Sequence, residues 1–317
     1  MNIVILDGYT TNPGDLSWSN LNALGKCTIY DRTKPSDLIE RSKNAEVIIT
    51  NKVVLSKEIL LQLPKLKFIT VLATGYNIVD IKAASELNIS VANVPEYSTK
   101  SVAQITFAHI LNFCHHIESH SSTVRNGDWS NSKDFCYWNF PLIELTGKKL
   151  GVIGFGKIGR EVLSIAKAFN MNVLINNRSK IYNLPENVVQ VDIETIFKES
   201  DYITLHCPLT EGNKQFINSK LINLMNPTAY LINTSRGGLI NESDLADALN
   251  SNKIAGAGLD VLSEEPPVNS SPLIEAKNCY ITPHIAWATF EAREKLIKVT
   301  VENVRCFIKN NPQNVVN

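Results

Sequence analysis

Three short segments, each following an apolar run typical of a strand, carry an arginine, a carboxylate and a histidine. The residues that could do chemistry are Arg236, Glu265 and His284. Because open parallel sheets bind ligands beyond the carboxyl ends of their strands, these side chains are expected to converge. An arginine can hold an anion through two parallel hydrogen bonds, and a histidine can transfer a proton near neutral pH. The segments therefore predict a site that binds a small anion and exchanges a proton with it.

A glycine motif, Gly154-Phe-Gly156-Lys-Ile-Gly159, lies between an apolar run at 150–153 and a helical pattern at 157–170. G-x-G-x-x-G alone is a weak signal, but a strand before it and a helix after it are the context of a dinucleotide fingerprint. Gly154 permits the tight turn, Gly156 lets the backbone approach a pyrophosphate, and Gly159 lets the helix pack on the strand. The helix N-terminus supplies unpaired N–H groups for the phosphates. The predicted cofactor contacts in the glycine motif are Gly154, Gly156, Lys157, Ile158 and Gly159. Three further predicted cofactor contacts follow later strand-like runs: Cys207, Pro208 and Thr234.

The residues that distinguish NAD from NADP are expected at the end of the next strand-like run, 172–176. The fingerprint usually has an Asp or Glu about 20 residues on, which accepts from the adenosine ribose hydroxyls. Here the chain reads Asn176-Asn177-Arg178-Ser179-Lys180, with no acid. An asparagine removes the charge that would repel a 2′-phosphate, and Arg178 could bind one, so this run favours NADP. NAD remains open, with Asn177 on an unphosphorylated ribose, and Asn177 and Arg178 are the predicted contacts.

Two series of apolar runs, separated by helical patterns, must position these residues. The strand-like runs lie at 3–6, 28–30, 47–50, 68–72 and 90–93, and then at 149–154, 172–176, 202–206, 229–233, 255–259 and 279–282. The helical patterns include 34–43, 56–62, 80–87, 99–125, 157–170 and 290–309. The runs are apolar throughout, as in parallel strands covered on both faces. This rhythm predicts two doubly wound α/β domains, Rossmann-like or flavodoxin-like, with a cleft between them.

Composition and charge narrow the partners. The 317 residues contain 31 Lys+Arg and 31 Asp+Glu and no basic block, which argues against nucleic-acid binding. No apolar run approaches the roughly 20 residues of a membrane span, and the first residues predict a strand, not a signal peptide. The six cysteines stand singly, as reduced thiols do. We therefore expect a cytoplasmic protein that binds neither nucleic acid nor membrane.

Two other clusters favour structural interpretations. His109, His116 and His120 share one face of the helix expected at 99–125, and the last two have metal-ligand spacing. No Glu accompanies them as in H-E-x-x-H, so the pattern favours a packed interface helix and no metal site is predicted. The aromatic loop that contains Trp138 belongs either to the core or to an interaction surface.

At these motifs the chain resembles the D-isomer-specific 2-hydroxyacid dehydrogenase family, over essentially its whole length. Four motifs occur in order: the dinucleotide fingerprint, an Arg236-Gly segment, Asp260-x-x-x-x-Glu265-Pro-Pro and Pro283-His284. Four motifs in register are far more specific than any one of them. The resemblance implies that Arg236, Glu265 and His284 are the catalytic residues.

The resemblance also assigns binding residues and domains. Thr74 and Gly75, after the run at 68–72, match the family's substrate-carboxylate loop, and Asp260 matches the residue that bonds the nicotinamide carboxamide. The implied domains are a substrate-binding domain at 1–97 plus 287–317 and a dinucleotide-binding Rossmann domain at 98–286.

The implied reaction is the NAD(P)H-dependent reduction of a small 2-keto acid to the D-2-hydroxy acid. Hydride moves to the carbonyl carbon while the oxygen takes a proton from His284. Glu265 would fix the imidazole tautomer and stabilise the imidazolium. Arg236 would bind the substrate carboxylate and stabilise the developing oxyanion.

Details within the family favour hydroxypyruvate or glyoxylate as the substrate. Formate-oxidising relatives typically have Gln in place of Glu265, and the opening segment at 6–18 resembles the glycerate dehydrogenase, or hydroxypyruvate reductase, branch. The family also implies a homodimer, in which Trp138 would help to close the partner's substrate cleft. An alternative of another class is a cofactor-sensing, corepressor-like interaction module, against which the intact Arg, Glu and His set counts.

Overall fold

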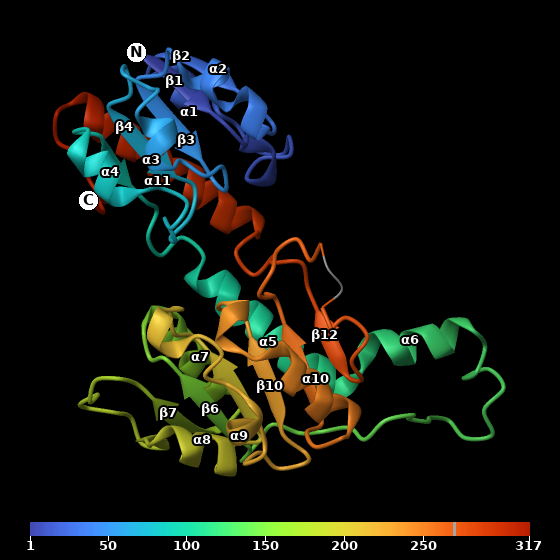
Figure 1. Ribbon diagram of the computed structural model, residues 1–317. Coiled ribbons are helices and arrows are strands. Elements are labelled where there is room, and N and C mark those ends of the chain that lie inside the picture. The colour runs from blue at the N-terminus through green and yellow to red at the C-terminus, as the bar shows by residue number, and fades with distance from the viewer. Residues whose placement is uncertain (269–270) are drawn as a thin grey trace. The chain divides into compact units, whose positions relative to one another are not determined.

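The computed structural model describes residues 1–268 and 271–317, which form two compact units (Figure 1). The first unit comprises Met1–Ser98 and Trp287–Asn317, and the second comprises Thr99–Ala286. The second unit is therefore inserted into the chain of the first. Each unit is built on one parallel sheet with helices on its faces, so the predicted fold class of two doubly wound α/β units is confirmed.

The first unit contains a five-stranded sheet in the order β2-β1-β3-β4-β5. Its strands are β1 Asn2–Ile5, β2 Lys26–Ile29, β3 Val47–Thr50, β4 Phe68–Val71 and β5 Ser90–Ala92. Its helices are η1 Gly8–Thr10, α1 Ser19–Asn22, η2 Pro35–Asp37, α2 Leu38–Ser42, α3 Lys57–Leu60, α4 Ile81–Glu86 and α11 Phe290–Ile308. Neighbouring strand residues face opposite sides: Ile48 packs with α2, α3 and α4, and Ile49 packs with α1 and α11. Burial on both faces explains why the strands are apolar throughout.

The second unit contains a seven-stranded sheet in the order β12-β11-β10-β9-β6-β7-β8. Its strands are β6 Lys149–Ile153, β7 Asn172–Asn176, β8 Val188–Gln190, β9 Tyr202–Leu205, β10 Tyr230–Asn233, β11 Gly256–Leu259 and β12 Cys279–Ile281. Its helices are α5 Thr99–His115, α6 Ile117–Arg125, α7 Lys157–Ala168, α8 Ile193–Glu199, η3 Glu211–Asn213, α9 Ser219–Ile222, η4 Gly237–Leu239 and α10 Glu242–Asn250. Helices α5 and α7 pack on one face, and α8, α9 and α10 pack on the other.

The helix predicted at 99–125 is wrong in one respect, because it breaks at His116. That residue has φ 46°, in the left-handed region, which ends α5 and redirects the chain into α6. Figure 1 shows α6 and the loop after it projecting away from the sheet of their unit. His109 is buried against β11, where Gly258 leaves room for its ring, whereas His116 and His120 contact Phe140. The three histidines therefore do not share one helical face.

Two carboxylates hold the opening segment of the first unit. The buried Asp7 accepts hydrogen bonds from the backbone N–H groups of Asn51 and Lys52, after β3. Asp15 forms a two-point ion pair with Arg293 of α11, and the Arg293 hydrogen bonds lower the pKa of Asp15. In the described part of the chain, no helix combines the length and the apolar character needed to cross a membrane.

Candidate active site

The glycine loop joins β6 to α7 and has space for a ligand at one position only. Gly154 has φ 93°, and a Cβ atom there would lie 2.6 Å from the backbone N of Cys207. A Cβ at Gly159 would collide with the carbonyl oxygen of Gly154, whereas a Cβ at Gly156 would meet no atom within 4 Å. The outer two glycines are thus required by packing. Gly156, the N-cap of α7, leaves open space at the N-terminus of this helix, the environment that a pyrophosphate needs.

The predicted ribose contacts lie at the end of β7. Asn177 Oδ1 accepts a hydrogen bond from Phe155 N at 3.2 Å, and Asn177 Nδ2 donates to the carbonyl oxygen of Ser179 at 3.0 Å. The Asn177 amide therefore ties the glycine loop to the turn that carries Arg178. The side chains of Arg178 and Lys180 are exposed on this turn.

Cys207, Pro208 and Thr234 follow the two central strands β9 and β10. Ser235 Oγ donates to the Cys207 carbonyl oxygen at 2.7 Å, which connects the two strand ends. Thr234 is buried, and its hydroxyl lies 3.0 Å from that of Thr106 on α5. Burial raises the pKa of the Cys207 thiol, so this group is protonated and neutral near the predicted phosphate site.

His284 and Glu265 form the shortest polar contact among the predicted site residues. His284 Nδ1 lies 2.5 Å from Glu265 Oε2, and Glu265 Oε1 accepts a hydrogen bond from Leu262 N at 3.0 Å. Both side chains are partly exposed. Since Glu265 occupies Nδ1, the proton that this imidazole can exchange with a ligand is the one on Nε2.

Asp260 fixes the loop that carries His284. Its carboxylate is 1% exposed and accepts from three donors: Thr282 Oγ1 at 2.6 Å, Ile285 N at 2.9 Å and Ala286 N at 2.8 Å. The backbone N–H of His284, which has φ 53°, donates to the Asp260 carbonyl oxygen at 2.9 Å. Asp260 thus holds the backbone at His284, the predicted proton donor. The contact of Asp260 with a cofactor stays a prediction.

Arg236 lies on a turn that packs against the Glu265 segment. Its side chain is exposed, and its Nη1 donates to the Ser235 carbonyl oxygen at 2.7 Å. A Cβ at Gly237 would collide with the backbone of Leu262, whose N–H donates to Glu265. The structure therefore brings the segments of Arg236, Glu265 and His284 together at the ends of β10, β11 and β12. Thr74 and Gly75 lie after β4 in the first unit.

Sequence reasoning missed two residues that shape this site. The buried Asn233 accepts from Ser235 N at 3.0 Å and donates to the Arg236 carbonyl oxygen at 2.9 Å, which holds the Arg236 turn. Thr282 donates to Asp260. An asparagine at the last position of an apolar strand, before a turn, is a common turn-stabilising residue, and this position could have identified Asn233. Thr282 carries no comparable signal, because its partner lies 22 residues away.

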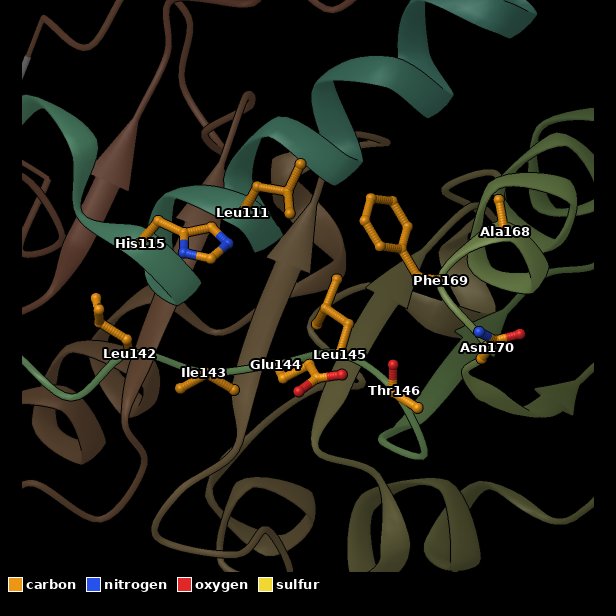
Figure 2. A pocket seen from close by; sticks show the side chains of 10 residues that line it. All are labelled: Leu111, His115, Leu142, Ile143, Glu144, Leu145, Thr146, Ala168, Phe169 and Asn170. Carbon is orange, nitrogen blue, oxygen red and sulfur yellow. The ribbon is translucent and has the colours of Figure 1, made fainter.

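A pocket of about 560 Å³ lies elsewhere in the second unit. It is bounded by α5, the segment at 142–146 and the C-terminal end of α7, whereas the predicted cofactor site is at the N-terminal end of α7. Figure 2 shows Leu111, Leu145 and Phe169 around this pocket. It is therefore separate from the candidate active site.

The comparisons with known proteins agree on one family. The model of the D-isomer specific 2-hydroxyacid dehydrogenase NAD binding domain matches residues 107–286. A hydroxypyruvate reductase of Blautia hydrogenotrophica is 46% identical over 321 residues, with complete coverage of both chains. A glycerate dehydrogenase of Methylorubrum extorquens is 40% identical over 290 residues and covers 90% of each chain.

A solved structure is also similar to the whole chain. An acyclic imino acid reductase in complex with NADPH and D-Arg superposes with a TM-score of 0.86 and 33% sequence identity, with complete coverage of both chains. This similarity includes both parallel-sheet units.

Proposed function

The chain belongs to the D-isomer specific 2-hydroxyacid dehydrogenase family, and from this premise we propose that it reduces hydroxypyruvate and glyoxylate to D-glycerate and glycolate. The observation that carries the proposal is the 2.5 Å contact between His284 Nδ1 and Glu265 Oε2, with the Arg236 turn packed beside it. Reduction of a 2-keto acid needs a proton donor for the oxygen and a cation for the carboxylate, and this set supplies both.

Each of the three side chains has a distinct role in this proposal. His284 donates the Nε2 proton to the keto oxygen and takes it back when the reaction runs in reverse. Glu265 holds the ring in the orientation that exposes Nε2 and stabilises the imidazolium. Arg236 binds the substrate carboxylate through its planar fork and stabilises the charge that develops on the oxygen. When bound, the nicotinamide supplies the hydride.

The choice of substrate rests on the relatives. The hydroxypyruvate reductase and glycerate dehydrogenase named above cover 100% and 90% of this chain, respectively, which favours short 2-keto acids. We assign substrate binding to the first unit, through Thr74 and Gly75, and dinucleotide binding to the second. The relatives named above are reductases and dehydrogenases, which gives the corepressor-like alternative no support.

The cofactor of this family is a nicotinamide dinucleotide, and the open space at Gly156 fits its pyrophosphate. We propose that NADPH is preferred to NADH, because the turn after β7 presents Arg178 and Lys180 and no acid. Comparing the KM values for NADPH and NADH tests it, and a lower KM for NADH would overturn it.

The thiols favour a reducing compartment. All six cysteines are free, and burial raises the pKa of Cys27 to about 11 and that of Cys279 to about 12. Unpaired, protonated thiols are typical of cytosolic proteins. We therefore propose a cytoplasmic location.

A homodimer is proposed from the apolar surface of α6 and its following loop. Phe135, Trp138 and Ile117 are 89%, 64% and 68% exposed, and the pocket of Figure 2 adjoins this segment through His115 and Leu142. Exposed aromatic and aliphatic side chains in one continuous segment are typical of an interface. We propose that a second copy of the chain covers them.

The activity is tested by mixing the purified protein with NADPH or NADH and each keto acid. We expect the absorbance of the reduced nicotinamide to fall with hydroxypyruvate and with glyoxylate. No fall with any short 2-keto acid and either cofactor would overturn the proposed function.

A further inference from the structure

The loop after β4, which carries Thr74, is fastened to the segment after β5 by three hydrogen bonds. Asn93 Nδ2 donates to the Thr74 carbonyl oxygen at 2.7 Å, and Thr74 Oγ1 donates to the Val94 carbonyl oxygen at 3.0 Å. Val94 N donates to the Ala73 carbonyl oxygen at 3.0 Å. The Thr74 hydroxyl proton is thus used within the protein, so the donors that Thr74 and Gly75 can offer a carboxylate are their backbone N–H groups.

Asn93 is itself held by an amide network that reaches the segment after α11. The backbone carbonyl oxygen of Asn93 accepts from Asn303 Nδ2 at 2.9 Å, and the backbone N–H of Asn93 donates to the Asn314 carbonyl oxygen at 3.1 Å. Asn314 Nδ2 donates to Asn303 Oδ1 at 2.8 Å. Asn303 is fully buried and Asn93 is nearly so. The Asn303 amide has hydrogen-bond partners at both its oxygen and its nitrogen, so rotating it would leave a buried polar group unpaired, and this fixed amide holds the backbone of Asn93.

We propose that Asn93 is a positioning residue for substrate binding, which orients the backbone N–H groups of the loop at Thr74 and Gly75 toward the substrate carboxylate. The inference rests on the proposed function, in which this loop binds the carboxylate. Asn93 does not touch the substrate in this scheme. It acts through the carbonyl oxygen of Thr74, and Asn303 and Asn314 hold the backbone from which its side chain extends.

The substitution Asn93→Ala removes the donor to Thr74 and tests the proposal. A carboxylate held equally in the ground and transition states affects KM and leaves kcat unchanged. Since one neutral hydrogen bond is lost, KM should rise about three- to tenfold. The rise should be the same for hydroxypyruvate and for glyoxylate, because both carry the same carboxylate. The dissociation constant of the reduced cofactor, measured by its fluorescence, should stay unchanged.

Asn317→Ala is the matched control. The Asn317 amide lies on the same segment as Asn314 and contacts Ser85, Ile89 and Val91, near the C label beside α4 in Figure 1, with no bond to the Asn93 network. Its KM should equal that of the wild type. Should Asn93→Ala fail to fold, Asn314→Ala removes one support of Asn303 and should raise both KM values by a smaller, equal factor.

Three results would overturn the inference. These are an unchanged KM in a folded Asn93→Ala protein (or, if that protein does not fold, in Asn314→Ala), a rise for one keto acid only, or an equal rise produced by Asn317→Ala. A wild-type protein that reduces neither acid would instead overturn the proposed function, and this inference with it. An active wild type with an unaffected variant overturns the inference alone.

Discussion

His284 is fixed from two directions, and this arrangement separates orientation from chemistry. Glu265 holds the ring at Nδ1, while Asp260 holds the backbone on both sides of the ring. The Glu265 carboxylate is held in turn by the N–H of Leu262. His284, which transfers the proton in the proposed reaction, is therefore held by groups that do not transfer one. A preorganised site requires such support.

Glu265→Gln should shift the high-pH decline of the keto-acid reduction rate to lower pH. Reduction needs the protonated imidazole of His284, and a neutral amide stabilises the imidazolium less than a carboxylate does. Loss of the correctly held acid should also lower kcat by about 10²-fold at neutral pH. The measurement is kcat against pH. Glu264→Gln, at the exposed neighbouring acid, is the control, and an unchanged profile in Glu265→Gln would remove Glu265 from this role.

Arg236→Lys should reduce kcat/KM for the keto acids by roughly ten- to hundredfold, since a charged hydrogen bond is worth about 1.5–3 kcal/mol. A lysine keeps the charge but loses the planar fork that binds both carboxylate oxygens. The dissociation constant of the cofactor should not change. Steady-state kinetics with hydroxypyruvate checks the expectation, and a near-normal kcat/KM would contradict the assignment of Arg236 to the carboxylate.

The residue types of the candidate site could be predicted from the sequence, but the residues that hold them could not. Arg236, Glu265 and His284 stand in motifs that follow apolar runs, and a parallel sheet brings such strand ends to one edge. Asn233 and Thr282 act through hydrogen bonds that only the folded chain forms. The position of Asn233 at the end of an apolar run is a signal for a turn-stabilising residue, whereas nothing in the local sequence of Thr282 distinguishes its bond from a solvated polar contact.

At the scale of the elements, two glycines of the Gly154–Gly159 motif have different roles: Gly159 is required for packing, and Gly156 is predicted to bind the cofactor. Gly159→Ala should lower the free energy of unfolding by about 1–3 kcal/mol, because the added methyl group collides with the Gly154 carbonyl oxygen. Gly156→Ala should change it by less than about 0.5 kcal/mol, since a Cβ there meets no atom. Cofactor binding should weaken in Gly156→Ala. Thermal unfolding and cofactor titration measure the two effects, and a folding defect in Gly156→Ala would refute the division.

The periodicity of polar and apolar residues in the sequence does not predict every boundary of a helix or strand. The helical pattern at 99–125 continues through His116 because one residue in a left-handed conformation changes the direction of a helix but not its polar and apolar composition. That conformation costs about 1–2 kcal/mol, and the stacking of His116 on Phe140, with ring centroids 4.4 Å apart, helps to offset it. Strand β8, Val188–Gln190, was not predicted; it contains only two apolar residues, and only Val188 is buried.

At the scale of the whole molecule, the inserted second unit presents an apolar segment that its own core does not cover. Trp129 Nε1 donates to the Phe135 carbonyl oxygen, and His120 Nε2 accepts from Asn139 N, so the loop is ordered against α6. An apolar surface that is already ordered loses little conformational entropy on association. Such a surface suits the interface proposed above between two copies of the chain.

Ile117→Asp should convert the protein from a dimer to a monomer. Ile117 lies on α6 and is largely exposed in the single chain, so a charge there costs little folding energy but would be buried unpaired in a dimer. Sedimentation velocity should give twice the chain mass for the wild type and one chain mass for the variant, with similar unfolding temperatures. Val54→Asp, at an exposed apolar residue of the first unit, should remain dimeric. A monomeric wild type, or a dimer that survives Ile117→Asp, would show that this segment is not the interface.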